Sequence, residues 1–112
     1  MDLDNTLIAL ADPTRRAILE RLSKGPAKVT EVAQPFPISL NSVSKHIRIL
    51  ERAELVRRAI SGREHLLTLN TEPLDELSAW TEHHRAFWTD RLGELDALLR
   101  AEDALTKAKG KK

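Results

Sequence analysis

Short hydroxyl, amide and cationic side chains gather along one edge of residues 39–50, SLNSVSKHIRIL. Val43, Ile47 and Leu50 recur at three- and four-residue spacing, which predicts a helix that buries all three against a core. The outward edge then consists of Asn41, Ser42, Ser44, Lys45 and Arg48. Small polar groups let a helix approach base edges closely, while lysine and arginine reach phosphates or guanine. The pattern predicts a helix that lies in the major groove of double-stranded DNA.

The segments before this helix predict the elements that position it. An aspartate and a proline at residues 12–13 are typical of a helix start, and that helix should end near residues 24–26, Lys-Gly-Pro. Thr30 is expected to cap a short helix that ends at the Pro-Phe-Pro break of residues 35–37. Ser39 should cap the polar-edged helix. Two helices joined by a short turn in this way predict a helix-turn-helix.

Two strands should follow, at residues 55–60 and 64–69, joined by a turn at Ser61-Gly62-Arg63. Three arginines, Arg57, Arg58 and Arg63, lie on the flank and tip of this hairpin. A basic hairpin directly after a recognition-type helix is a wing. We expect its arginines to contact DNA phosphates or the minor groove.

A long helix is predicted from about Leu74 to about Ala101, because no residue in between breaks it. It would be about 40 Å long, more than a small domain can cover. An apolar stripe runs along it, formed by Leu77, Trp80, His84, Trp88, Leu92, Leu95 and Leu99. Packing within one subunit would explain any single member. The stripe as a whole favours a homodimer interface.

Composition bounds the remaining alternatives. The 112 residues predict one winged-helix DNA-binding and dimerisation domain over residues 1–105 and a disordered basic tail over 106–112. The fold class is mainly α with a small β-hairpin. The chain has no cysteine, no glycine-rich phosphate loop and no clear catalytic triad, so we do not expect an enzyme. No apolar run is long enough to cross a membrane, and a cytoplasmic location is expected.

Charge is distributed unevenly along the chain, although its formal net value is only +1. Residues 38–70 carry six basic side chains against three acids, whereas residues 71–105 carry three arginines against nine acids. Solvated faces explain each charge taken singly. The contrast between the two segments indicates a basic surface suited to a polyanion.

Three strings carry a resemblance to the ArsR/SmtB family of winged-helix transcriptional repressors: ALADPTRRAILERL, SVSKHIRILERAELV and VRRAISGREHLLTL. Together they cover about residues 5–70, and the long closing helix is similar to the family's dimerisation element. The resemblance implies a homodimer with the 39–53 helix in the major groove and the hairpin near the backbone or minor groove. Repression of transcription is the outcome it implies.

Metal sensing by members of this family uses either cysteines before the recognition helix or Asp, His and Glu on the closing helices. The segment VTEVAQPF holds no cysteine. The closing helix offers Glu82, His83, His84 and Asp96, but adjacent histidines point about 100° apart on a helix. His84 also lies on the tryptophan stripe, where a packed histidine is favoured over a ligand. The chain therefore resembles a metal-independent branch, with no cofactor expected.

Two residues depart from simple expectations. Glu54 stands where the family has glycine, so it must accept a left-handed conformation or reshape the turn. His46 lies within the recognition helix, where a structural role and a phosphate contact are equally compatible with its spacing.

The competing function is a winged-helix protein-interaction module without DNA binding, which would leave the polar edge of the helix unexplained. The sequence identifies neither the operator nor the regulated gene, nor any small-molecule or protein effector.

Overall fold

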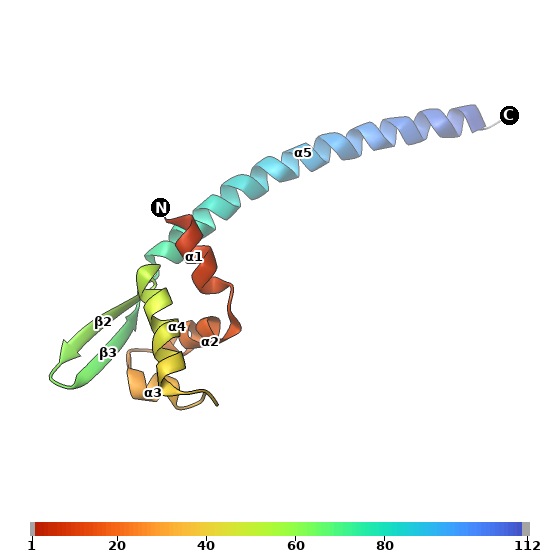
Figure 1. The fold of residues 1–112 in the computed structure, drawn as a ribbon. Coiled ribbons are helices and arrows are strands. Elements are labelled where there is room, and N and C mark those ends of the chain that lie inside the picture. Colours follow the sequence, from red (N-terminus) through yellow and green to blue (C-terminus); the bar gives the residue numbers. More distant parts are fainter. Residues whose placement is uncertain (1, 111–112) are drawn as a thin grey trace. The chain divides into compact units, whose positions relative to one another are not determined.

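The computed structural model describes residues 2–110, with side chains as far as residue 105 (Figure 1). It divides into two compact units, Met1–Leu77 and Ser78–Lys112. The elements in chain order are α1 Leu3–Leu10, α2 Pro13–Ser23, β1 Ala27–Lys28, α3 Val29–Ala33, α4 Leu40–Arg52, β2 Val56–Ser61, β3 Glu64–Leu69 and α5 Glu72–Gly110. The predicted class, mainly α with a hairpin in a winged helix-turn-helix, is confirmed.

Side-chain caps begin two of the helices as predicted. The Asp12 carboxylate accepts the backbone N–H of Arg15 at 3.1 Å and starts α2, while the Ser39 hydroxyl accepts the N–H of Ser42 at 3.1 Å and starts α4. The prediction that Thr30 caps the short helix was wrong. The Glu31 carboxylate reaches back to accept the backbone N–H of Lys28 at 3.2 Å, and α3 therefore begins at Val29, one residue before the threonine.

The sheet has three antiparallel strands in the order β1-β3-β2. Strand β2 pairs with β3 from Val56 opposite Leu69 to Ser61 opposite Glu64, so the predicted hairpin is confirmed. Strand β1 was not predicted. It pairs through Ala27 with Leu67 and is too short to show an alternating pattern of its own.

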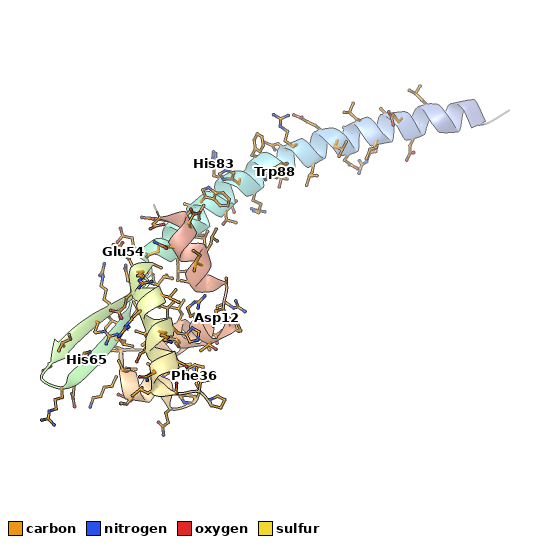
Figure 2. The ribbon with its side chains drawn as sticks, viewed as in Figure 1. Asp12, Phe36, Glu54, His65, His83 and Trp88 are labelled. Carbon is orange, nitrogen blue, oxygen red and sulfur yellow. The ribbon has the colours of Figure 1, made fainter. Side chains whose placement is uncertain are left out.

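The core of the first unit lies between α1–α4 and the sheet. Val43, Ile47 and Leu50 are completely buried, as the helical spacing predicted. They join a cluster drawn from every other element of this unit up to β3, whose fully buried members include Ile18, Val32, Leu55 and Leu67. Half-buried Phe36 packs against the same cluster from the loop before α4 (Figure 2).

A left-handed residue turns the chain from α4 into the wing. Glu54 has φ 59°, so of the two alternatives at this position, a left-handed conformation or a reshaped turn, the structure has the left-handed conformation. Its backbone N–H donates to the Glu51 carbonyl at 2.9 Å, and the next N–H, of Leu55, donates to Leu50 at 3.0 Å. The Asn70 amide donates to the Glu54 carbonyl at 2.7 Å. These bonds fix the turn in spite of the missing glycine.

Helix α5 ends at Gly110 rather than near Ala101. The residues between these points are mostly alanine, leucine, lysine and acids, which are good helix formers, and no proline interrupts them. Residues 111 and 112 of the predicted disordered tail lie outside the described residues, and the division into residues 1–105 and 106–112 stays a prediction. Among residues 2–110, no helix is apolar over a length that could cross a membrane.

The conformation of Glu54 yields a stability prediction. Glu54→Gly should raise the free energy of unfolding by about 0.5–1 kcal/mol, because relief of left-handed strain exceeds the extra entropy that glycine gives the unfolded chain. Urea denaturation at one fixed protein concentration measures it. Glu54→Ala is the matched control, since it removes the carboxylate but keeps Cβ. An equal gain from alanine would assign the effect to charge rather than to φ.

Candidate nucleic-acid interface

The outward face of α4 is a line of polar and cationic residues. Asn41, Lys45 and Arg48 are exposed and succeed one another at helical spacing. Arg52, four residues after Arg48, continues the line and is also exposed, although sequence reasoning did not include it. Among the described residues, none of these side chains has a hydrogen-bond or ion-pair partner. The face is therefore free to bind an external anion or base edge.

Two serines lie at the margins of this face, half-buried. Ser39 donates its hydroxyl hydrogen to the Ser42 hydroxyl oxygen at 3.0 Å while accepting the Ser42 backbone N–H. The Ser42 hydroxyl thereby keeps its own hydrogen for an outside acceptor. Ser44 is likewise half-buried. The capping interaction thus holds a small hydroxyl group at the first turn of α4.

His46 points away from the outward face and into a network between helices. Its Nδ1 lies 3.2 Å from Nη1 of Arg15 and 3.8 Å from a carboxylate oxygen of Asp12. Arg15 also donates to the carbonyls of Ile8 at 2.7 Å and Ala9 at 2.9 Å. The Arg15 guanidinium can donate to Nδ1 of the tautomer that carries its hydrogen on Nε2. His46 thereby ties α4 to the junction of α1 and α2.

The Asp12 side chain at this junction is held ionised. The pKa of its carboxyl group lies below its usual value, chiefly because the backbone N–H of Arg15 donates to it. The charged form strengthens both the cap of α2 and the attraction to the Arg15 guanidinium. The network supports the structural role that the sequence left open for His46, and the phosphate contact stays a prediction.

The three wing arginines have different surroundings. Arg58 donates through Nη2 to Glu51 at 2.6 Å and lies with Nη1 2.9 Å from Nδ1 of His65, and its side chain is only 23 % exposed. It therefore ties the sheet to the last turn of α4. Arg57 and Arg63 are exposed, and neither side chain has an ion-pair partner among residues 2–110. The free cations of the wing are these two, while a DNA contact by Arg58 stays a prediction.

A groove of about 430 Å³ separates the start of α3 from the inner side of the wing. Its polar lining is Lys28, Thr30, Arg58, Arg63, Glu64 and His65. The Lys28 ammonium lies 2.9 Å from the Glu64 carboxylate, and this hydrogen bond raises the pKa of Lys28 above its usual value. Sequence reasoning missed Lys28 and Thr30, because only the pairing of β1 with β3 brings them beside the wing. Of the three cations that line the groove, only Arg63 has no ion-pair partner among the described residues, because Lys28 is paired with Glu64 and Arg58 with Glu51.

In the second unit, the predicted stripe of α5 is largely exposed. Trp88 is 60 % exposed, and the side chains of Trp80, Leu92, Leu95 and Leu99 are exposed as well. His84 is the exception: its ring stacks on Trp80 with centroids 4.2 Å apart, and Nδ1 lies 2.9 Å from the Trp80 carbonyl oxygen. Leu77, at the end of the first unit, is half-buried.

The acidic groups considered as metal ligands have cationic partners. Glu82 lies 2.7 Å from Arg85, whose hydrogen bond lowers the pKa of the glutamate, and Asp96 lies 3.1 Å from Arg100. Within the part of the chain that the structure describes, no cluster of three histidine, cysteine or acidic residues could hold a metal ion.

Comparisons with known proteins agree on one class of regulator. Residues 10–59 match a family model described as a helix-turn-helix domain. The HTH-type transcriptional regulator Rv2034 of Mycobacterium tuberculosis is 39 % identical over 99 residues, 88 % of this chain and 90 % of that protein. The transcriptional repressor SdpR of Bacillus subtilis is 36 % identical over 70 % of this chain and 87 % of its own length. A crystal structure of an ArsR family transcriptional regulator superposes with a TM-score of 0.76 at 42 % identity, covering 80 % and 98 % of the two chains.

The contrast between Arg58 and Arg63 yields a prediction about stability. Arg58→Ala should lower the free energy of unfolding by about 1–2 kcal/mol, because it leaves the half-buried Glu51 carboxylate without its charged donor. Arg63→Ala should change it by less than about 0.5 kcal/mol, since that side chain has no such contact. Urea unfolding of both variants and of Glu51→Ala measures this. Equal losses from the two arginine variants would contradict a structural role for Arg58.

Proposed function

This chain belongs to the ArsR/SmtB family of winged helix-turn-helix transcriptional regulators, and from that premise we propose that it is a homodimeric repressor of an inverted-repeat operator. It is a DNA-binding regulator and not an enzyme. The observation that carries the proposal is the outward face of α4, where Asn41, Lys45 and Arg48 are exposed and unpaired among the described residues. The proposal assigns this face to the major groove.

Within that face, we assign the two ends different tasks. The first turn holds Asn41 and Ser42, whose small polar groups can reach base edges, and Lys45 follows one turn later. Arg48 and Arg52 lie further along the helix, where a long cation reaches the phosphates that border the groove. Ser44, at the margin of this face, is assigned with Ser42 and Lys45 to the readout of base edges.

The wing supplies the second part of the proposed contact surface. Arg57 and Arg63 are exposed and have no partner among residues 2–110, so both can pair with phosphates or enter the minor groove. Arg63 also lines the groove between α3 and the wing, where Lys28 is already paired with Glu64. Phosphate contacts of this kind fix register and affinity but carry no sequence information.

The proposed homodimer rests on the stripe of α5. A helix that exposes two tryptophans and several leucines leaves apolar surface in water until another surface covers it, and burial contributes about 25 cal/mol per Å². A second copy offers the same stripe, so the interface would be two-fold symmetric. A two-fold dimer places its paired recognition helices about 34 Å apart, which demands half-sites about one helical turn apart.

The proposal includes no metal and no cofactor. We assign control of this regulator to its expression level or to a small-molecule or protein effector.

A regulator of chromosomal genes acts where the DNA lies, which is the cytoplasm in bacteria such as those of the named relatives. The competing function, a protein-interaction module, predicts no preference among DNA sequences.

Selection of fragments from a random DNA pool by the purified chain tests the proposal. An inverted repeat should be enriched, with half-sites about one helical turn apart. The same protein should retard the selected duplex in a gel at concentrations that leave a scrambled duplex free. Recovery of no motif, together with equal binding to all duplexes, would favour the interaction module instead.

The two surfaces should respond differently to mutation. Lys45→Ala should cost about 1–3 kcal/mol on the selected site and relax the preference at one base pair in each half-site. Binding isotherms on the site and on single-base variants measure it. Uniform weakening on all sequences would reassign Lys45 from base readout to phosphate contact.

Arg63→Ala is the matched cationic variant on the wing. It should weaken binding to specific and random DNA alike, and reduce the slope of log affinity against log salt by about 0.9 for each phosphate that the arginine neutralises in the wild-type complex. Titrations across a salt series measure that slope. An unchanged slope and affinity would remove Arg63 from the interface.

The homodimer generates its own prediction. Replacing Trp88 and Leu95 with glutamate should yield monomer and abolish operator binding, because charges would be buried on the two-fold interface. Sedimentation equilibrium at micromolar concentration measures mass, and Glu94→Gln with Glu102→Gln on the same helix is a control that should stay dimeric. A folded wild-type monomer at that concentration would refute the dimer.

A further inference from the structure

Two large apolar side chains are exposed at the start of the recognition helix. Leu40 is the first residue of α4 and is 52 % exposed, and Ile38 precedes the Ser39 cap and is 42 % exposed. The next apolar residue of the helix, Val43, is completely buried. Leu40 lies three residues before Val43, so it is on the same side of the helix one turn earlier. There the core has ended, and the Leu40 side chain is exposed. Neither Leu40 nor Ile38 is among the apolar residues that pack against the core cluster of the first unit.

The backbone that carries these side chains is well fixed. The Ser39 hydroxyl bonds both the N–H and the hydroxyl of Ser42, which sets the direction of the first turn. In the preceding loop, Phe36 packs against the core, and its N–H donates to the Ala33 carbonyl at 3.1 Å. Ile38 and Leu40 therefore lie directly before and after the Ser39 cap, on backbone that these hydrogen bonds fix.

The chemistry around Leu40 identifies what it could contact. Asn41 follows it directly, Ser42 is on the same turn, and Ser44 and Lys45 are one turn further along. Leu40 therefore lies among hydroxyl, amide and ammonium groups. The DNA major groove presents hydrogen-bond acceptors, hydrogen-bond donors and one apolar group side by side, and it matches this mixed surface. That apolar group is the 5-methyl of thymine, which protrudes into the major groove and is read by apolar side chains. N-terminal residues of a recognition helix are the ones that meet base edges.

We propose that Leu40, with Ile38 beside it, reads a thymine 5-methyl group in each operator half-site, and so determines sequence preference by apolar contact. The inference rests on the proposed function, since it requires that the first turn of α4 enters the major groove. It adds a readout that needs no hydrogen bond. Burial of one methyl group between Leu40 and the groove removes apolar surface from water on both sides.

Deoxyuridine scanning tests this contact, because uracil differs from thymine only by the missing methyl group. Each thymine of the selected operator is replaced in turn, and affinity is measured by titration. Wild-type protein should lose about threefold to tenfold in affinity at one or two positions of each half-site. Leu40→Ala should bind the unmodified operator more weakly by a similar factor and should no longer distinguish thymine from uracil at those positions.

Leu66→Ala is the matched control. Leu66 is 38 % exposed on β3 and is not among the residues assigned to the DNA surface, so its truncation should leave both affinity and the response to uracil unchanged. Circular dichroism and thermal unfolding show whether the Leu40 variant is folded. Its affinity for random duplex should equal that of wild type, because phosphate contacts are intact.

The outcomes separate the two proposals. If no specific operator is recovered, the proposed function fails, and with it the inference. If an operator is bound specifically, two results would overturn the inference alone: wild-type affinity that is equal for thymine and uracil at every position, or a Leu40→Ala variant that stays as sensitive to uracil as wild type. The second result would assign methyl readout to another residue.

Discussion

The direction in which α4 faces depends on the burial of three side chains. Val43, Ile47 and Leu50 are completely buried, and burial of each contributes about 1.5–3 kcal/mol. Their sum is comparable to the whole stability of a small domain. Turning the helix by one residue would rotate it by about 100° and expose them. The outward line of Asn41, Lys45 and Arg48 is therefore a consequence of the core rather than of any contact that these residues make themselves.

Local patterns were sufficient to predict this part of the molecule. The spacing of apolar residues indicated α4 and its buried face, and the caps at Asp12 and Ser39 indicated two helix starts, because each depends on residues within one turn of one another. The left-handed turn at Glu54 was one of two alternatives that the comparison with the family's glycine left open. Short elements were harder, since β1 has two residues and the start of α3 was decided by the reach of Glu31.

The identity of the free cations could not be read from the sequence. The sequence places all three arginines, Arg57, Arg58 and Arg63, in the same hairpin and does not distinguish them. In the structure, the Glu51 carboxylate at the end of α4 pairs with Arg58 at 2.6 Å. Arg15 and His46 are 31 residues apart in the chain and meet only once α2 packs on α4. Such pairs depend on tertiary packing, which no local spacing encodes. Charge counting along a sequence therefore overestimates the cations that a fold leaves available to a ligand.

The charges of the two segments assign them different partners. Binding along a DNA backbone releases counterions only where cations meet phosphates, and five of the six basic side chains of residues 38–70, all but Arg58, have no ion-pair partner among the described residues. In residues 71–105, nine acids outnumber three arginines, and Arg85 and Arg100 are already paired with Glu82 and Asp96. An acidic helix near phosphates would be repelled, so the tryptophan stripe of α5 is not a DNA surface. Self-association, as we propose, covers that stripe while leaving the acids in water, where they stay hydrated and oppose non-specific contact with DNA.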